Sequence, residues 1–473
     1  AGFDSGDVWP RRWAEFYTTE SRSSIYDYLR GHGIHFFPFV HWVERGLYGP
    51  GNSYPRFHMV WGTGRRLVDR LLEQLEAHPK RKNLEIRFLH KVTGLLSSQN
   101  RITGCEGIIE SEGRSTQQDA ERWGDPSGRP FQIQAEHTVL ASGGIGGSVD
   151  RVRRFWGAGN PPATILNGSY PTADGLLHDV AASAGARITH LDRMWNYAAG
   201  VRHPRPLFEN HGLSLVPPKT ALWVNAHGRR IGPLPLITAY DTKYLVDRVC
   251  EEPGGYSWQI LNRKIAEKEL AGSGSEFNDA IRDRRVFSFL WTLLRGNKRL
   301  VDDLCAHCPD FIVAASVPEL IEKMNRSTDL PGSLPVDGRL LTREIDSYDR
   351  AIQTKPAFQN DEQLRRIQHL RRYRGDRLRT LRKQTIVDQK ALPLIAIRES
   401  ILSRKSLGGI QTDLDCAVLD GSGQRIIGLL AVGEAAGFGG GGIHGKGSLE
   451  GTFLGSCILT GRRAAAAIAH GIV

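Results

Sequence analysis

The residues best suited to chemistry lie near the C-terminal end of the sequence, between Gly428 and Thr452. A short apolar run ends in Gly433-Glu434, and a loop made mostly of glycine follows. His444 lies in this loop and supplies an imidazole side chain. A carboxylate at a strand end can accept hydrogen bonds from sugar hydroxyls. The unpaired N–H groups and the positive dipole at a helix start stabilise a flat or anionic group. These features together predict a dinucleotide site, and we interpret it as a flavin site.

Two elements must position that loop. The apolar run from Gly428 predicts a buried strand, and residues Phe453–Ala469 predict a helix. Glycine allows a ligand to approach the backbone closely. We therefore expect Gly445 and Gly447 to let the ring lie near the chain, with the N–H groups of about Ser448 to Gly451 facing it.

The same segment resembles the closing motif of the fumarate reductase/succinate dehydrogenase flavoprotein superfamily, in its 3-ketosteroid dehydrogenase-like branch. The resemblance lies in the strand ending in Glu434, the glycine run 437–442, His444-Gly and the final Leu-Glu-Gly-Thr452. Arg56-Phe-His-Met-Val-Trp-Gly-Thr-Gly64 also resembles this branch. The alternative is a glycine-rich linker before a surface helix, which would not normally carry a buried strand ending in a carboxylate. The resemblance implies FAD as the cofactor and extends from Arg56 to the C-terminus.

A second glycine-rich turn follows the apolar run Thr138-Val-Leu-Ala. It resembles the strand end that approaches the cofactor in flavoproteins with two dinucleotide domains, although any turn between a strand and a helix can be rich in glycine. The predicted cofactor-binding residues are Ser142, Gly143, Gly144, Gly433, Glu434, Gly445, Gly447, Ser448, Leu449, Gly451 and Thr452.

The remaining pattern predicts both helices and strands. The expected helices cover residues 12–29, 65–77, 176–184 and 453–469. The expected strands cover residues 84–89, 92–96, 102–109, 131–135 and 138–141, with a hairpin turn at Gln99-Asn100.

Together with these elements, the resemblance implies an α/β fold: an incomplete Rossmann-like FAD-binding domain of the two-dinucleotide-binding type, with an inserted α+β substrate (cap) domain. Residues 1–147 and 386–473 would form the FAD-binding domain, and residues 148–385 the cap. The family opens with a strand, Gly-x-Gly-x-x-Gly, a helix and an acid ~20 residues later, and we find no such unit here. Gly437–Gly442 matches Gly-x-Gly-x-x-Gly in letters, but too little sequence follows it for a helix, a second strand and an acid. We therefore expect a fragment of a longer protein or a truncated gene product.

Three residues are candidates for catalysis. His444 could contact substrate or transfer a proton, although it could equally be a structural histidine. Lys405 precedes Ser406-Leu-Gly-Gly409, where fumarate reductases carry His-Thr-x-Gly-Gly; a lysine there could serve an anion or an enolate, or simply face solvent. Tyr197 is a candidate proton carrier in the cap, as are Tyr170 and Tyr256.

Two departures from the family narrow the substrate. Ser448 stands where fumarate reductases place the arginine that grips a dicarboxylate, so fumarate would lose its bidentate partner. Ile443-His444 stands where 3-ketosteroid Δ1-dehydrogenases place a catalytic tyrosine, so that mechanism is in doubt as well.

We therefore predict an FAD-dependent dehydrogenase that moves a hydride between flavin N5 and a carbon–carbon bond next to a carbonyl, possible substrates being ketosteroid-like. The alternatives are a fumarate reductase-type flavoprotein and a non-catalytic remnant that binds through basic residues. No metal site is predicted, because Cys305-Ala-His-Cys308 has no second cysteine pair.

Composition limits the partners and the location. The net charge is +11, and Arg365–Lys383 holds eight arginines and one lysine against Asp376. This segment could bind an anionic partner, but Leu364, Ile367, Leu370, Leu378 and Leu381 favour a solvated helix with an apolar stripe. Nucleic acid is disfavoured, because aromatic residues are nearly absent there. We expect an apolar small-molecule substrate with a carbonyl, no transmembrane segment, and a cytoplasmic location consistent with scattered cysteines.

Overall fold

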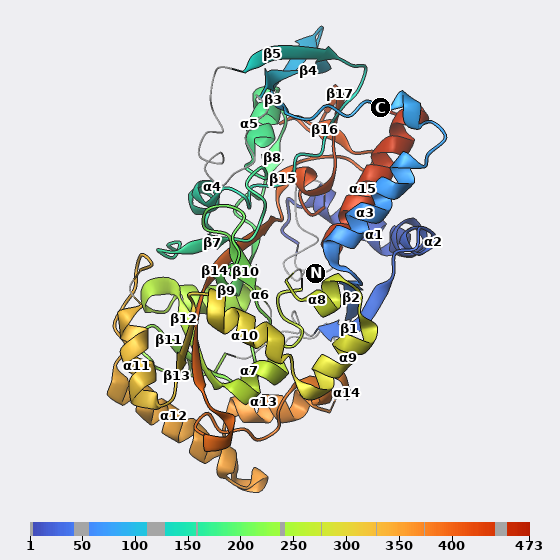
Figure 1. The fold of residues 1–473 in the computed structure, drawn as a ribbon. Coiled ribbons are helices and arrows are strands. Elements are labelled where there is room, and N and C mark those ends of the chain that lie inside the picture. The colour runs from blue at the N-terminus through green and yellow to red at the C-terminus, as the bar shows by residue number, and fades with distance from the viewer. Residues whose placement is uncertain are drawn as a thin grey trace.

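Two larger β-sheets organise the chain, one in the upper half and one in the lower half of Figure 1. The computed structural model describes residues 3–41, 56–110, 128–157, 159–236, 242–275, 277–327, 329–372, 374–439 and 452–473. Helices pack around both sheets, so the fold is a mixed α/β structure. Among the described helices, none combines the length and apolar character needed to cross a bilayer.

The upper sheet is mixed, with β17 in its interior. Its strands are β3 (His90–Ser98), β4 (Arg101–Ile109), β5 (Arg129–Gln134), β6 (Thr138–Leu140), β16 (Ala417–Leu419) and β17 (Arg425–Ala431). β17 runs parallel to β4 and β6 and antiparallel to β16. The predicted hairpin is confirmed as β3–β4, and Gln99 and Asn100 have positive φ angles of 50° and 62°, as tight hairpin turns require.

The lower sheet is built around the long strand β14 (Leu394–Ser406). The other strands are β7 (Ile165–Asn167), β9 (Met194–Arg202), β10 (Gly212–Ser214), β11 (Leu222–Asn225), β12 (Ser257–Asn262) and β13 (Phe311–Ala314). The first part of β14 pairs with β12 and β13, and its second part pairs with β9 and β7. β14 follows residue 386 in sequence, yet it pairs with strands from the segment predicted as the cap. Where a domain boundary lies stays a prediction.

Helices near the upper sheet include α15, which α1 contacts. These helices are α1 (Val8–Glu20), α2 (Tyr28–Gly31), α3 (Thr63–Glu76), α4 (Val149–Arg154), α5 (Leu176–Ser183) and α15 (Thr452–Ala469). Short pairings add β1 (Phe36–His41) with β2 (Arg56–Val60) and β8 (Ile188–Thr189) with β15 (Gly409–Ile410). The predicted helices 65–77, 176–184 and 453–469 are therefore confirmed as α3, α5 and α15, to within two residues at each end.

The lower sheet contributes to the largest apolar core, together with the helices around it. These helices are α6 (Thr242–Cys250), α7 (Arg263–Glu269), α8 (Asp279–Arg282), α9 (Val286–Arg295), α10 (Lys298–His307), α11 (Val317–Arg326), α12 (Gly338–Gln353), α13 (Glu362–Leu370) and α14 (Arg374–Arg379). Buried strand residues such as Ile260 and Ile397 are 0% exposed. This core holds β14 in place, and β14 in turn carries Lys405 toward the upper half.

Two sequence-based predictions of secondary structure are wrong. The segment 84–89 is not a strand: residues 84–87 are irregular and 88–89 form a turn. Its alternating apolar side chains are exposed, Phe88 to 79%, so they gain nothing from a pleated conformation. The arginine-rich segment is not one helix either, because α13 ends at Leu370 and α14 starts at Arg374. The apolar stripe packs inward over α13 and at Leu381, whereas Leu378 on α14 is exposed to 41%.

Candidate active site

The two predicted glycine-rich turns lie side by side because their strands are parallel neighbours. β6 pairs with β17 from Thr138 to Leu140, and the amide of Val432 donates to the carbonyl of Leu140 at 2.9 Å. Carboxyl ends of parallel strands meet at one edge of a sheet. The turn that begins at Ser142 therefore emerges beside Glu434, which joins two segments far apart in sequence.

A third segment, the end of β14, closes this junction. The amide of Ser406 donates to Oε1 of Glu434 at 2.9 Å, and the hydroxyl of Ser406 accepts from the amide of Ile145 at 2.7 Å. A Cβ on Gly144 would lie only 2.5 Å from both Glu434 Oε1 and Ser406 Oγ. Residue 144 must therefore be glycine for the three segments to meet at this distance.

Neighbouring residues hold the turn 142–147 against β14. Ser403 Oγ donates to the carbonyl of Gly146 at 2.9 Å, and Asn167 Nδ2 donates to the carbonyl of Gly147 at 2.8 Å. Gly143 has a positive φ of 80°. The turn is thus a backbone surface held in a fixed conformation by buried polar side chains.

Helix α15 packs against the same junction through its first half. The amide of Gly433, at a φ of 63°, donates to the hydroxyl of Thr460 at 2.9 Å. Thr452 is the first residue of α15, next to Phe453. The ring of Phe453 stacks on Phe438 with centroids 5.2 Å apart. The predicted order of strand, carboxylate and helix is therefore present around Glu434.

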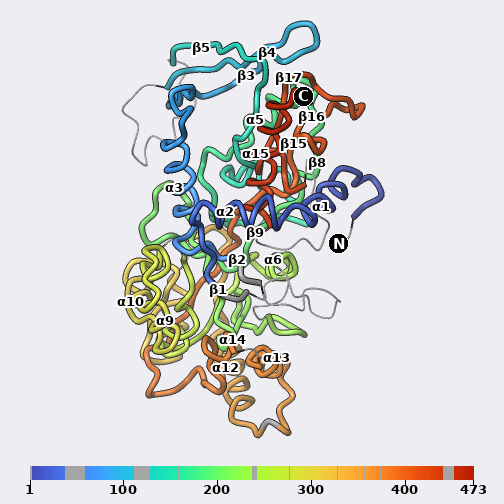
Figure 2. The backbone as a smooth tube through the Cα atoms, turned by 90° about the vertical axis from the view of Figure 1, so that its right-hand side faces the viewer, coloured from blue at the N-terminus to red at the C-terminus, as the bar shows by residue number. Residues whose placement is uncertain are grey.

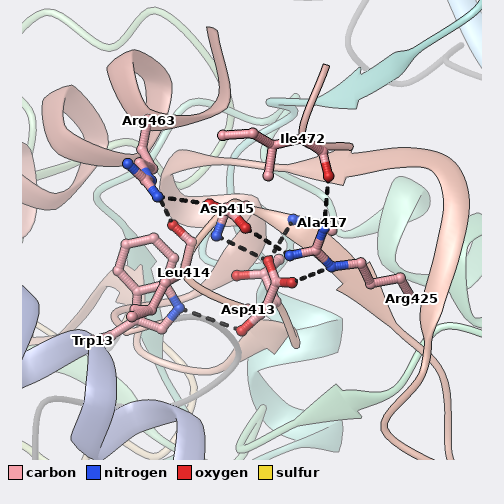
Figure 3. Close-up of polar contacts among 9 residues, drawn as sticks. Trp13, Asp413, Leu414, Asp415, Ala417, Arg425, Arg463 and Ile472 are labelled. Carbon is pink, nitrogen blue, oxygen red and sulfur yellow. Dashed lines mark hydrogen bonds and ion pairs between the residues drawn. The ribbon is translucent and has the colours of Figure 1, made fainter. Parts of the chain in front are cut away.

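A separate polar network fixes α15 farther along its length (Figure 3). Asp415 accepts from Arg425 Nη2 at 2.6 Å and from Arg463 Nη2 at 2.7 Å. Asp413 accepts from Arg425 Nε at 2.6 Å, and Trp13 Nε1 donates to the carbonyl of Thr412 at 3.3 Å. These bonds tie α1, β17 and α15 to one loop, so the position of α15 relative to the strand end is well determined.

Electrostatics at the junction centre on Glu434. Burial raises the pKa of Glu434 above its usual value, and this is opposed by the Ser406 amide and by the positive charges of Lys405 and Arg404. Burial, with the charge of Glu434 second, raises the pKa of the Cys457 thiol to about 11. The site therefore holds a carboxyl group beside two cationic side chains in a partly desolvated setting.

Lys405 lies among aromatic and apolar side chains. Its Nζ is 4.9 Å from the centre of the Phe453 ring, and it pairs with Trp195 across β14 and β9. Trp195 packs on the cluster of Leu407, Phe438 and Phe453. The structure thus brings Lys405 next to Glu434 and the start of α15, rather than leaving it on an isolated surface.

Tyr197 follows Trp195 by two residues on β9, so both belong to one face of the strand. The guanidinium of Arg404 lies 5.5 Å from the centre of its ring. Arg404 precedes Lys405 on β14, and its charge opposes the rise that burial causes in the pKa of Glu434. Tyr197 therefore neighbours the cationic end of β14.

The other candidates differ in their setting. Tyr170 is 63% exposed, whereas the hydroxyl of Tyr256 is held by the backbone of Leu334.

Cys308 is buried, and burial raises the pKa of the Cys305 thiol to about 11. Within the described ranges, no group of His, Cys, Asp and Glu side chains has the arrangement of a metal site.

Several predicted site residues lie outside the described residues: His444, Gly445, Gly447, Ser448, Leu449 and Gly451. Their roles stay predictions. In contrast, Ser406 emerges as a residue that sequence reasoning missed, although it contacts both glycine-rich turns. The available signal was the match of Lys405-Ser406 to His-Thr in the family motif, where the second residue also carries a hydroxyl.

The described residues fit a flavin dinucleotide. Glu434 is an anchored carboxylate suited to a ribityl or ribose hydroxyl, and the backbone of Ser142–Gly144 lies beside it. Close packing of Gly144 against Glu434 and Ser406 leaves room only for a hydrogen atom and holds this backbone next to the carboxylate. Lys405 and α15 place positive potential at the same junction.

Comparisons with known proteins agree with this chemistry. The model of the family described as the FAD binding domain matches residues 5–454. A KsdD-like steroid dehydrogenase of Mycobacterium tuberculosis is 39% identical to the chain, and the match covers 100% of this chain and 83% of that protein. A KsdD-like steroid dehydrogenase of Mycolicibacterium smegmatis is also 39% identical, and the match covers 96% of this chain and 82% of that protein.

Solved structures show the same fold at low identity. A flavocytochrome c3 fumarate reductase in an open conformation matches with a TM-score of 0.61 at 16% identity, covering 97% of this chain and 64% of that one. A 3-ketosteroid Δ4-(5α)-dehydrogenase from Rhodococcus jostii RHA1 matches with a TM-score of 0.52 at 17% identity. The match covers 99% of this chain and 84% of that one. This chain therefore spans less than two thirds of the fumarate reductase.

Proposed function

The chain belongs to the FAD binding domain family, and from that premise we propose that it is a dehydrogenase for ketosteroid-like substrates. It uses FAD and acts as an oxidoreductase on a carbon–carbon bond next to a carbonyl. The observation that carries the proposal is the junction of Gly144, Ser406 and Glu434, with Lys405 beside it, in a chain that is 39% identical over its full length to steroid dehydrogenases.

In this proposal the upper sheet belongs to an incomplete Rossmann-like FAD-binding domain, formed by residues 1–147 and 386–473. Residues 148–385 form a cap that covers the substrate. The support is that the described residues proposed to face the flavin come from the ends of β6, β17 and β14 and from the start of α15. The protein is proposed to work in the cytoplasm, where its free cysteines would persist.

Each residue at the junction has a proposed task. When bound, FAD supplies a flavin ring that accepts a hydride at N5. Glu434 holds a ribityl or ribose hydroxyl, and Ser406 fixes the orientation of Glu434 through its amide. Ser142, Gly143 and Gly433 offer backbone to the cofactor, while Thr452 and the start of α15 offer the positive end of a helix dipole.

Lys405 is proposed to supply positive charge to the reacting centre. Fixed positive charge stabilises negative charge that develops during a reaction, most effectively in a site shielded from water. The aromatic surroundings of Lys405 provide that shielding and also favour an apolar substrate over a polar one. Tyr197 and His444 are the proposed proton-transfer groups, since proton removal next to a carbonyl needs a positioned base.

A dicarboxylate substrate is disfavoured in this proposal. Ser448 stands where fumarate reductases place the arginine that binds a dicarboxylate. A serine cannot form the same bidentate pair with a carboxylate. The apolar cluster around Lys405 offers little compensation. A ketosteroid needs one polar contact at its carbonyl and apolar contacts elsewhere.

The test is anaerobic flavin reduction. The purified chain is incubated with FAD, freed of unbound cofactor, and mixed with a 3-ketosteroid or with succinate while flavin absorbance is followed. We expect retained flavin and bleaching by the steroid only. Bleaching by succinate would instead support a fumarate reductase-type activity. A folded protein that retains no FAD would overturn the enzymatic proposal and favour a non-catalytic protein.

A further inference from the structure

Helix α9 exposes a continuous apolar stripe. Phe287, Leu290, Trp291 and Leu294 are exposed to 89%, 44%, 61% and 56% respectively. Their spacing of three and four residues places them along one face of the helix. Isolated exposed apolar residues are normal, but a contiguous patch with two aromatic rings marks an interaction surface. We call these four residues the α9 stripe.

The opposite face of α9 is well packed, so the exposure of the stripe is not a sign of a loose helix. Phe289 is 0% exposed, and its ring lies 5.1 Å from Phe37 and 5.7 Å from Trp61. At the C-terminal end, Lys268 Nζ donates to the carbonyls of Leu293 and Leu294 at 2.5 and 2.9 Å. The helix is therefore held rigidly with its stripe facing outward, at one edge of the lower half in Figure 2.

Arginine residues lie at the end of the stripe and on the neighbouring helix α14. Arg295 lies over the ring of Trp291 at 5.2 Å, and α14, which carries exposed Arg374 and Arg377, contacts α9. Arg371 lies beside this helix and donates to the carbonyl of Arg377 at 3.1 Å; burial lowers its pKa, Glu269 opposes this, and the charges of Arg382 and Arg377 add to it. Like charges gathered in this way create a positive field next to the apolar stripe.

Three acidic residues near α9 already form ion pairs with other basic side chains. Asp376 is buried and accepts from Lys219 Nζ at 3.3 Å and Arg379 Nη2 at 2.5 Å. Asp279 pairs with Arg299 at 3.1 Å. Asp283 pairs with Arg282 and Arg285 on α8 and the following turn. With these acids paired to basic side chains, the exposed arginines of α14 add positive charge beside α9.

We propose that the α9 stripe and the arginines of α14 form a docking surface for an anionic lipid bilayer. Aromatic and leucine side chains beside arginines are the pattern of a helix that lies in the membrane interface. α9 has 10 residues, whereas ~20 are needed to span a bilayer, so it would lie in the plane of the surface. The positive field matches the negative surface potential of anionic lipids.

A second copy of this chain fits less well than a lipid surface, because arginines flank the stripe. A second copy would bring its own arginines against them, and like charges facing each other oppose association. A lipid surface satisfies both the apolar stripe and the arginines beside it.

The test is co-sedimentation of the full chain with vesicles of phosphatidylcholine alone and with vesicles that also contain phosphatidylglycerol. We expect binding to the anionic vesicles that weakens with added salt, as interfacial charge attraction does. Phe287→Ser with Trp291→Ser should weaken this binding about tenfold or more, since it removes the largest apolar side chains. Arg374→Glu with Arg377→Glu should weaken it about tenfold as well.

Matched variants control for apolar content and charge. Val68→Ser with Leu72→Ser removes exposed apolar side chains from α3, and Arg339→Glu with Arg343→Glu reverses exposed charges on α12. Both should retain binding, and the thermal midpoints of all four variants should match that of the parent chain. Failure of the parent chain to sediment with anionic vesicles, or equal binding by the α9 variant, would overturn the proposal. A dimer that the α9 variant abolishes, without vesicle binding, would assign the stripe to a second copy instead.

Discussion

The amide of Ser406 donates to Oε1 of Glu434 at 2.9 Å, which joins the end of β14 to the end of β17. The two residues are 28 positions apart: Ser406 ends β14 of the lower sheet, and Glu434 follows β17 of the upper sheet. The hydroxyl of Ser406 also accepts from the amide of Ile145. A single serine therefore connects the segments that carry most of the described cofactor-binding residues.

Gly144→Ala should weaken FAD binding and lower stability. The added Cβ would lie 2.5 Å from Glu434 Oε1 and Ser406 Oγ, so the junction must open, at a cost of about 1–3 kcal/mol. Flavin retention after gel filtration and the thermal midpoint measure the two effects. Gly461→Ala on α15 is the matched control, because a Cβ there meets nothing within 4 Å and alanine favours a helix. Equal flavin retention by Gly144→Ala and the parent chain would contradict the assigned site.

Lys405→Met should slow flavin reduction while leaving flavin retention intact. Removing one fixed charge that stabilises the reacting centre costs about 10²-fold or more in rate in comparable sites. Lys405→Arg keeps the charge and should recover part of the rate. Anaerobic rapid mixing gives the rate, and the reduction potential of the bound flavin should fall in Lys405→Met. An unchanged rate and potential would assign Lys405 to packing against Phe453 alone.

Glu399→Gln should stabilise the protein at neutral pH and have little effect in acid. Glu399 is 0% exposed, and burial raises its pKa well above the ordinary value of 4.5. The folded state therefore keeps a proton that the unfolded chain releases, so the contribution of this group to stability falls as pH rises above 4.5.

Thermal midpoints of Glu399→Gln and the parent chain, measured between about pH 4 and about pH 8, test this coupling. The difference between the two should grow with pH. Glu15→Gln, at an exposed position on α1, is the control and should show no such trend. A difference that stays constant or shrinks with rising pH would show that Glu399 is not buried as a neutral acid.

Asp415→Asn should destabilise the protein without altering the flavin junction directly. Asp415 accepts from Arg425 and Arg463 (Figure 3), and its side chain is 16% exposed against 36% for each arginine. Solvent screens these ion pairs. We therefore expect the free energy of unfolding to fall by about 1–3 kcal/mol, which is less than the cost of breaking a fully buried pair. Calorimetry measures it, with Asp346→Asn at an exposed position on α12 as the control. Equal midpoints for the two variants would mean that the network adds no net stability.

The local elements of this fold follow from the sequence where local physics determines them. Gln99-Asn100 specifies a hairpin because both residues tolerate positive φ. The helix from Thr452 to Ala469 is predicted by a run of small and apolar residues without proline. The same reasoning failed for residues 84–89, where alternation alone predicted a strand. Pairing with a neighbouring strand stabilises such a pattern, and a single sequence does not show whether a neighbour exists.

What the sequence by itself determined about this protein is the identity of the chemical groups: glycines at two turns, the carboxylate of Glu434, and the helix that begins after them. These signals are local, because turn and helix preferences depend on neighbouring residues. Only the tertiary structure decided that Ser406 links Glu434 to the first turn, that Lys405 lies beside Phe453, and that the stripe on α9 faces outward. Those relationships depend on strand register and on which helix face packs inward, and both are settled by contacts between residues far apart in the chain.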